Sequence, residues 1–236
     1  MSALRLFSQF GVIKMMSRVE KISELTTMRL SIYLRCVTEL SAEGIASVSS
    51  ETLAKRFHLN SAQIRKDLAN FGEFGVRGVG YNIPQLSEHL TRIMGLDREH
   101  KVGIIGAGRL GMALTDYYGF RRANFDVAAL FDADESKVGK KVGGIEILDI
   151  KNFAKAAAKY KIEVAVIAVP AANAQAALDL VDKAGIKAVL NFAPVPLKVE
   201  GDIKVKSIDL TTSLESLSYF LASGTNGIAT KLDGAA

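Results

Sequence analysis

Hydrophobic residues between Leu30 and Leu40 recur every three or four positions along the chain. This period places them on one face of a helix. The pattern therefore predicts an amphipathic helix from about Thr26 to Ala42, and Gly44 is placed to end it.

Two shorter helices are predicted next, each preceded by residues that favour a helix N-terminus. One follows Ser49 or Ser50 and runs to about Phe57, and the other covers about 60–71 after a tight connection. Two helices joined by such a short turn are typical of a helix-turn-helix. The second helix would then be the one that reads DNA.

The buried face of that second helix is fixed by Ile64, Leu68 and Phe71. Its polar residues then fall mostly on the outer surface, where side chains of these types can pair with bases or phosphates. They are Gln63, Arg65, Lys66 and Asn70. An ordinary solvated helix would show the same mixture, so the helix alone leaves DNA binding open.

A glycine-rich segment from Gly72 to Tyr81 follows, with alternating side chains that predict a hairpin. Such a hairpin is a natural wing, and Arg77 near its tip would reach a groove or phosphates. The alternative is an ordinary surface hairpin. Pro84 then opens a further helix, which Gly95 ends.

The charge of +5 is unevenly distributed. Residues 1–98 hold 13 Lys and Arg against 9 Asp and Glu, whereas the remainder holds 17 against 16. This asymmetry permits nucleic-acid binding, although a slightly basic protein of another kind would also show it. The single cysteine, Cys36, suits a reducing cytoplasm, and no apolar run reaches transmembrane length. We assign no metal, since the histidines lack partners at metal-ligand spacing.

From Lys101 the pattern changes to a short apolar strand that runs into a glycine-rich turn and then a helix to about Tyr118. In such a turn the first glycine allows the sharp bend, the second lets the backbone approach a pyrophosphate and the third permits close helix packing. The residues of this predicted dinucleotide-binding turn are Gly106, Ala107, Gly108, Arg109, Leu110 and Gly111.

A second strand, from about Val127 to Phe131, ends at Asp132. A carboxylate about 20 residues beyond the last glycine takes the adenine-ribose hydroxyls of a dinucleotide. It would repel a 2′-phosphate, so we expect NAD(H) rather than NADP(H). The alternative, an aspartate that only ends a strand, does not explain the agreement of strand, glycines and spacing.

Further strands alternate with helices, which predicts a parallel, doubly wound sheet. Ligands of such sheets bind beyond the carboxyl ends of the strands. Pro170, Asn191 and Asp209 follow later strands, so we expect them to join the glycine turn and Asp132 around one cleft.

The last predicted helix, at about 212–223, is too apolar to stand alone, so we expect it to bury against its own domain or a partner subunit. All three histidines precede the predicted first strand of the sheet, and although Tyr117, Tyr118 and Asp209 could act as acids or bases, nothing arranges them as a known catalytic relay. We therefore predict a regulator without catalytic turnover. The alternatives are an NAD-dependent dehydrogenase with a helical amino-terminal domain and a dinucleotide-binding protein that docks on another protein.

The chain resembles the Rex family of redox-sensing transcriptional repressors from about Thr27 to Leu221. The resemblance rests on an ordered series of motifs. They are Tyr33-Leu34-Arg35, Gln63-Ile64-Arg65-Lys66-Asp67-Leu68, Phe71-Gly72, Arg77-Gly78-Val79-Gly80-Tyr81, the glycine turn at 106–111, Asp116-Tyr117, Phe131-Asp132, Asn191-Phe192-Ala193-Pro194 and Ile208-Asp209-Leu210.

The resemblance implies a cytoplasmic homodimer that binds palindromic operator DNA and either NADH or NAD⁺, with NADH releasing the DNA. It adds Tyr81 to the DNA-binding residues and implies that the last helix swaps onto the partner. It also implies a switch in which Asp209 engages Arg35 in the DNA-binding state and Tyr117 in the NADH state. Leu210 stands where some members place Phe against the nicotinamide.

These expectations divide the chain into five parts. They are an extension at 1–25 outside the family pattern, a winged helix-turn-helix domain at 26–98, a Rossmann NAD(H)-binding domain at 99–211, a dimerisation helix at 212–225 and a tail at 226–236.

Overall fold

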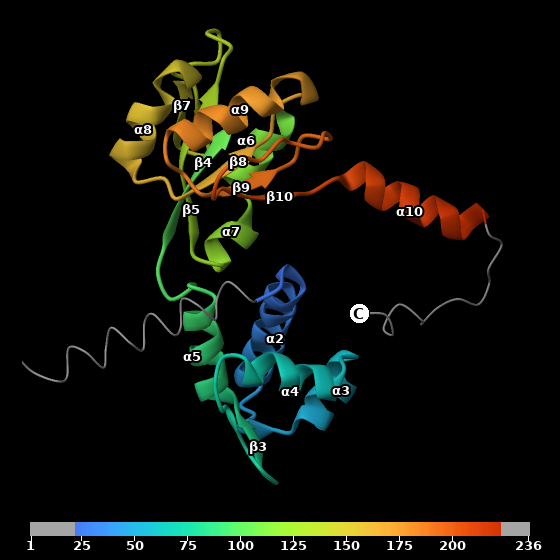
Figure 1. Ribbon diagram of the computed structural model, residues 1–236. Helices are drawn as coiled ribbons and strands as arrows, with labels where there is room; N and C mark the ends of the chain where they lie inside the picture. The colour runs from blue at the N-terminus through green and yellow to red at the C-terminus, as the bar shows by residue number, and fades with distance from the viewer. Residues whose placement is uncertain (1–21, 223–236) are drawn as a thin grey trace, which may run out of the picture. The chain divides into compact units, whose positions relative to one another are not determined.

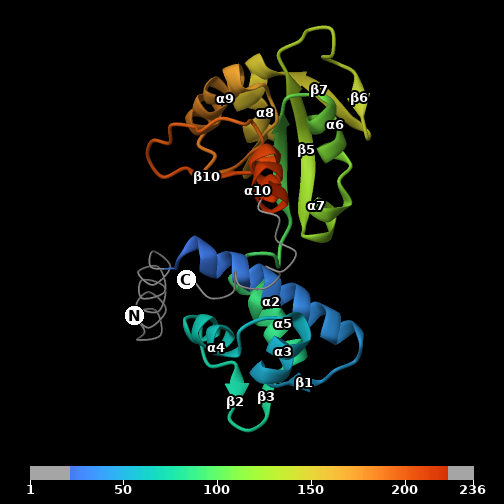
Figure 2. The same ribbon diagram turned by 90° about the vertical axis from the view of Figure 1, so that its right-hand side faces the viewer.

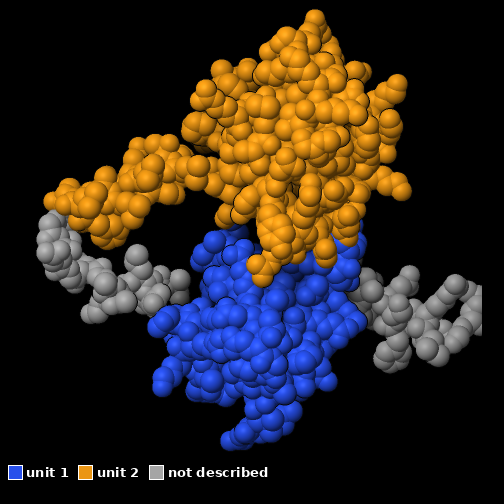
Figure 3. All heavy atoms as spheres, turned by 180° about the vertical axis from the view of Figure 1, so that it is seen from behind, with its two compact units in different colours: residues 1–98 blue, residues 99–236 orange. Residues whose placement is uncertain are grey.

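The computed structural model describes residues 22–222. The chain divides into two compact units, Met1–Arg98 and Glu99–Ala236, which Figure 3 colours separately. Most of the predicted extension (residues 1–21), the end of the predicted last helix (223–225) and the tail (226–236) lie outside the described residues.

Over residues 22–98 the first unit holds four helices and a small antiparallel sheet of order β1-β3-β2 (Figure 2). The helices are α2 (Glu24–Ala42), α3 (Ser50–Phe57), α4 (Ser61–Ala69) and α5 (Ile83–Ile93), and the strands are β1 (Ser47–Val48), β2 (Gly75–Val76) and β3 (Gly80–Asn82). Strands β2 and β3 follow the α3–α4 pair in the chain and form the predicted wing, so the unit is a winged helix-turn-helix.

Side chains at the predicted helix starts cap these helices. Ser49 accepts a hydrogen bond from the N–H of Thr52, and Asn60 accepts one from the N–H of Gln63. The predicted extension of α4 to Phe71 is wrong. The N–H groups of Asn70 and Phe71 turn back to the carbonyls of Asp67 and Leu68, so the helix ends at Ala69 in a tighter turn.

The second unit is a seven-stranded sheet of order β10-β9-β8-β4-β5-β7-β6 with helices on both faces (Figures 1 and 2). Its strands are β4 (His100–Ile105), β5 (Phe125–Asp132), β6 (Lys141–Val142), β7 (Ile145–Asp149), β8 (Val164–Ile167), β9 (Ala188–Asn191) and β10 (Lys204–Ser207). Its helices are α6 (Arg109–Thr115), α7 (Tyr118–Arg122), the 3₁₀ turn η1 (Ile150–Asn152), α8 (Phe153–Tyr160), α9 (Ala171–Lys183) and α10 (Leu210–Ala222).

Adjacent residues of the central strands face opposite layers. Ile104, Leu130 and Val166 belong to a core that includes residues of α6 and α7, whereas their neighbours in the strands join a core with α8 and α9. Both faces of these strands are therefore apolar, as the parallel sheet requires.

The sheet is not wholly parallel, which corrects the prediction. Strand β6 runs antiparallel to β7, because Gly143 and Gly144 take positive φ values of 56° and 83° and turn the chain in a two-residue hairpin. The edge of the sheet beside β7 is thus covered by a short strand that the periodicity did not reveal.

The predicted helix from Arg109 to Tyr118 is also wrong, because it breaks after Thr115. Tyr117 has an extended backbone, with ψ of 110°, and its ring packs edge-on against Phe120 at 5.2 Å between centroids. Phe120 packs in turn against the core on the α6–α7 side, so α7 is a separate helix and does not continue α6. Within residues 22–222, no helix is both long and apolar enough to cross a membrane.

Candidate functional site

The turn between β4 and α6 has the geometry that the glycine pattern predicted. Gly106 has a φ of +108°, and a Cβ there would collide with the carbonyl of Ala168. A Cβ on Gly111 would overlap the carbonyl oxygen of Gly106, so the third glycine brings α6 tightly against the turn. Gly108, the residue before α6, faces open space. A ligand phosphate can therefore approach the backbone at the helix N-terminus.

Asp132 lies beside this turn at the end of β5. Its Oδ2 accepts hydrogen bonds from the N–H of Ala107 at 2.8 Å and from Nζ of Lys137 at 3.1 Å, and its Oδ1 accepts one from the N–H of Asp134 at 2.8 Å. Burial alone would raise the pKa of Asp132, but these donors together lower it. The carboxylate is thus ionised and fixed next to the proposed pyrophosphate position.

The other predicted cofactor residues lie at neighbouring strand ends of the same sheet. Pro170 precedes α9, close to the turn, because Ala168 meets Gly106. Asn191 is fully buried at the end of β9: its Nδ2 donates to the carbonyl of Ala193 at 3.2 Å and to Oγ of Ser207 at 3.2 Å, and its Oδ1 accepts from the N–H of Ala193 at 2.9 Å. This geometry indicates that Asn191 shapes the loop, and direct cofactor contact by its side chain stays a prediction.

Tyr117 is 55% exposed between α6 and α7. A Cβ on Gly119 would collide with its ring, so the ring lies directly over the backbone of that glycine. Arg109 and Leu110, in the first turn of α6, are also exposed. These three side chains are accessible on the α6–α7 side of the second unit.

Asp209 lies at the N-terminus of α10. Its Oδ1 accepts from the N–H groups of Thr211 at 2.8 Å and Thr212 at 3.2 Å, and its Oδ2 accepts from the hydroxyl of Thr212 at 2.9 Å. The hydrogen bonds from Thr212, more than that from Thr211, lower the pKa of Asp209. The carboxylate is therefore a helix cap, which explains why α10 begins at Leu210 and not at Thr212. Arg35, its proposed partner, is exposed on α2 of the first unit.

The predicted reading face of α4 is only partly open. Arg65 and Lys66 are exposed, and Nη1 of Arg65 donates to Oγ of Ser50 at 2.7 Å and to Oε1 of Glu51 at 2.5 Å. Gln63 does not lie fully on the outer surface as predicted. It is half-buried because its Nε2 donates to Oδ1 of Asp67 at 2.8 Å.

The wing presents Arg77 at its exposed tip, where Gly78 takes a positive φ of 81°. A groove of about 680 Å³ separates the wing from α3 and α4. Tyr81 is 8% exposed and belongs to the core of the unit. Its burial indicates a role in holding the wing, and a direct DNA contact by Tyr81 stays a prediction.

The sequence patterns did not predict an ion pair behind α4 that is buried at its acidic residue and partly exposed at its arginine. Asp67 of α4 accepts two hydrogen bonds from the guanidinium of Arg29, at 2.6 and 2.9 Å, and one from the hydroxyl of Tyr33 at 2.9 Å. Both partners come from α2, over thirty residues away in the chain. The only signal in the sequence was an aspartate on the apolar side of α4, between Ile64 and Leu68.

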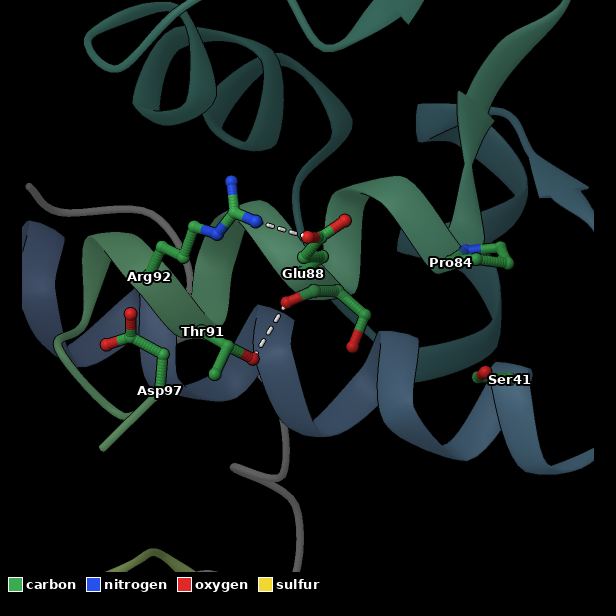
Figure 4. A pocket seen from close by; sticks show the side chains of 7 residues that line it. Ser41, Pro84, Glu88, Thr91, Arg92 and Asp97 are labelled. Carbon is green, nitrogen blue, oxygen red and sulfur yellow. Dashed lines mark hydrogen bonds and ion pairs between the residues drawn. The ribbon is translucent and has the colours of Figure 1, made fainter. Parts of the chain in front are cut away.

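A second hollow on the first unit lies along α5 and the end of α2 (Figure 4). Two of its three charged lining residues, Glu88 and Arg92, pair with each other, and the hydroxyl of Thr91 donates to the carbonyl of Ser87. We assign no ligand to this hollow. Among residues 22–222, no group of three His, Cys, Asp or Glu side chains is arranged to hold a metal ion.

Comparisons with known proteins agree with both halves of this geometry. A family described as CoA binding domain matches residues 97–195, and one described as putative DNA-binding protein N-terminus matches residues 21–69. The redox-sensing transcriptional repressor Rex of Desulfitobacterium hafniense is 42% identical over 84% of this chain and 95% of its own length. Rex of Carboxydothermus hydrogenoformans is 45% identical over 84% of this chain and 96% of its own length.

The chain belongs to the Rex family of transcriptional repressors. The Rex-family repressor RSP, in complex with β-NAD⁺ and operator DNA, aligns with a TM-score of 0.82 and 37% identity over 86% of this chain and 93% of RSP. RSP in complex with β-NADH aligns with a TM-score of 0.76 and 35% identity over 86% of this chain and 95% of RSP. The two curated relatives and RSP are all named as repressors.

Proposed function

We propose that this Rex-family protein is a repressor that binds palindromic operator DNA as a homodimer and is released from it by NADH. The observation that carries the proposal is the β4–α6 turn with Asp132 beside it, on a chain that also carries a winged helix. The relatives named above support both ligands, because RSP was solved with NAD⁺ and operator DNA and also with NADH. A DNA-binding repressor must reach the chromosome, which in bacteria such as those of the named relatives lies in the cytoplasm. We therefore propose that this protein is cytoplasmic.

The cofactor would lie across the carboxyl ends of the central strands. Its pyrophosphate would meet the N-terminus of α6 above Gly108, and its adenine ribose would bind Asp132. Gly106, Ala107, Arg109, Leu110 and Gly111 form the turn around it, while Pro170 and Asn191 shape the neighbouring strand ends. Each ligand shifts the protein only as far as it prefers one conformation over the other.

The DNA would meet α4 and the wing. Gln63 and Arg65 from α4 supply groups that pair with bases, Lys66 from α4 and Arg77 from the wing tip supply cations for phosphates, and Tyr81 supports the wing from within the core. The positive charge of the amino-terminal segment agrees with this role.

The dimer would be held by α10, whose large apolar side chains are exposed in the single chain. Leu214, Leu217 and Leu221 are 67%, 59% and 84% exposed, and Tyr219 and Phe220 are exposed beside them. A helix this apolar requires a covering surface. The family resemblance supports a second copy of the chain as that surface, with α10 exchanged between subunits.

The switch would run through Asp209. Reduction of NAD⁺ to NADH removes the positive charge of the nicotinamide ring, and Asp209 follows the last strand of the cofactor-binding sheet. An acid at this point responds to that charge by changing partners, from Arg35 in the DNA-binding state to Tyr117 in the NADH state. A tenfold preference of one ligand for one state supplies about 1.4 kcal/mol, which lies within the usual range of allosteric coupling.

One titration tests this function. A palindromic duplex is first selected from a random library by the protein in NAD⁺, and its binding is then followed by fluorescence anisotropy as NADH or NAD⁺ is added. We expect NADH to release the duplex and NAD⁺ to leave it bound. A protein that selects no sequence, or that oxidises NADH with a carbonyl substrate while ignoring DNA, would be a dehydrogenase or a docking protein instead.

A further inference from the structure

The buried carboxylate of Asp67 accepts four hydrogen bonds within the first unit. It is 2% exposed and accepts from three side chains: Arg29 twice, Tyr33 at 2.9 Å and Gln63 at 2.8 Å. Three of these four hydrogen bonds come from α2, and the fourth comes from the outer side of α4 itself. The carboxylate thus links the helix behind α4 to a residue that we assign to the DNA-facing surface.

The protonation states of this cluster are fixed. Burial alone would raise the pKa of Asp67, but the hydrogen bonds from Arg29, Gln63 and Tyr33 lower it overall. Burial and the neighbouring carboxylate raise the pKa of Tyr33, so its hydroxyl keeps the proton that it donates. Near neutral pH, Asp67 therefore only accepts hydrogen bonds.

An acceptor-only neighbour determines which way the Gln63 amide faces. The NH₂ group must point toward Asp67, because the amide oxygen would be repelled by the carboxylate. Oε1 then lies at the opposite end of the amide, and one N–H remains unused by Asp67. A glutamine on an ordinary exposed helix would instead exchange its two ends freely.

We infer that Arg29, Tyr33 and Asp67 are positioning residues that make Gln63 a reader of adenine. With one end held, Gln63 offers an acceptor for the N6 amino group of adenine and a donor for N7, which is the pairing that glutamine makes in the major groove. The inference rests on the proposed function, because it requires α4 to face operator bases. It adds that the specificity of one symmetric pair of operator positions is set from behind the helix, by residues that touch no DNA.

The test compares sequence profiles and not affinity alone. Duplexes selected from a random library are sequenced for the wild-type protein and for Gln63→Ala, Asp67→Asn, Tyr33→Phe and Lys66→Ala. We expect Gln63→Ala to lose about tenfold or more of the preference for adenine at one symmetric pair of positions, with the other positions unchanged. Asp67→Asn should lose the same preference, since an asparagine can donate or accept and no longer fixes the amide. Tyr33→Phe should weaken it.

Lys66→Ala is the matched control, because it removes a charge from the same helix without touching the cluster. It should lower affinity for all sequences and leave the profile intact. If Gln63→Ala changes the profile while both Asp67→Asn and Tyr33→Phe leave it unchanged, the positioning role is wrong and the repressor function stands. If the wild-type protein selects no sequence, the proposed function itself fails.

A direct measurement covers the case in which Asp67→Asn does not fold. In ¹⁵N NMR spectra, the two side-chain amide protons of Gln63 should be separate and slow to exchange in the wild-type protein, and Tyr33→Phe should shift them. Side-chain amide signals that resemble those of an exposed glutamine would overturn the inference.

Discussion

Thr212 holds the carboxylate of Asp209 at the start of α10 with two hydrogen bonds, from its N–H at 3.2 Å and from its hydroxyl at 2.9 Å. The residue that we propose as the switch acid is therefore also the cap of the helix that we propose as the dimer contact. Any partner that draws Asp209 away competes with this cap, so the two roles are separable by substitution.

Asp209→Asn should keep the cap and lose the charge, because asparagine is as good an N-cap residue as aspartate. We expect its dimer to stay intact while NADH loses most of its power to release DNA. Asp209→Ala should lose both properties. Sedimentation velocity measures the dimer, and anisotropy measures the NADH response. Equal dissociation of the Asn and Ala dimers would contradict the separation.

Gly108→Ala and Gly111→Ala form a matched pair at the glycine turn. A methyl group on Gly108 enters open space, so the fold should keep its melting temperature while NADH affinity falls by tenfold or more. A methyl group on Gly111 overlaps the carbonyl of Gly106, so that variant should melt earlier. Calorimetry of unfolding and of NADH binding checks both. Unchanged NADH affinity in Gly108→Ala would place the pyrophosphate elsewhere.

Cofactor choice should depend on two charges that lie 3.1 Å apart, Asp132 and Lys137. Asp132→Asn removes the carboxylate that would repel a 2′-phosphate, so we expect the preference for NADH over NADPH to fall by about tenfold. Lys137→Ala should have the opposite effect and weaken NADPH binding, because it removes the only nearby cation bonded to Asp132 in the described residues. Titration calorimetry with both cofactors gives the two ratios. A preference unchanged in Asp132→Asn would exclude it from ribose recognition.

The Asp67 cluster should make the stability of α2 and α4 depend on acid pH. The pKa of Asp67 is lowered in the folded protein, so its contribution is complete above the unfolded value of about 4 and is lost as the pH falls below it. Asp67→Asn leaves Arg29 without its ionic partner. Because the Arg29 side chain is 28% exposed and can still be hydrated, we expect a loss of about 1–3 kcal/mol near neutral pH. Hydrogen exchange of the amides in α2 and α4 measures the difference in stability between the wild-type protein and Asp67→Asn. We expect this difference to shrink as the pH is lowered from 7 toward 3. A difference independent of pH would assign the loss to packing.

Phosphate contacts should appear in the salt dependence of DNA binding. Arg77 at the wing tip occurs twice in a dimer, so Arg77→Ala should reduce the slope of log K against log salt by about 2. Lys159→Ala, on α8 of the other unit, is the charge-matched control and should leave the slope unchanged. The measurement is an anisotropy titration at several salt concentrations. Equal effects of the two variants would indicate a general charge effect and not a contact by the wing.

The elements that the sequence predicted correctly depend on local chemistry. Ser49 and Asn60 cap their helices through neighbours three residues away, and the glycine turn is set by sterics within six residues and the adjoining strand end. Strand β6 was missed, although Gly143-Gly144 between apolar residues is a local hairpin signal. The helix break before Tyr117 could not be predicted from local patterns, because it depends on the packing of Phe120 against the hydrophobic core.

The Asp67 cluster shows what local patterns cannot supply. Arg29 and Asp67 are 38 positions apart, and the apolar side of α4 on which Asp67 lies does not indicate which residue pairs with it. Only the packing of α2 behind α4 makes their pairing possible. The half-buried position of Gln63 follows from the same contact, so sequence periodicity placed it too far outward.

Helix α2 is unbroken from Glu24 to Ala42, and this continuity constrains how operator release can occur. It carries Arg35 on an exposed position and, less than two turns earlier, the arginine and tyrosine that hold α4. In the proposed dimer, a displacement of Arg35 therefore moves the whole winged helix-turn-helix unit, and the contacts between α2 and α4 stay intact. A palindromic operator fits only one distance between the two DNA-binding units of a dimer, about one turn of DNA. NADH would thus release the operator by changing the distance between the two DNA-binding units. Each unit would still bind DNA of any sequence weakly and in a salt-dependent way.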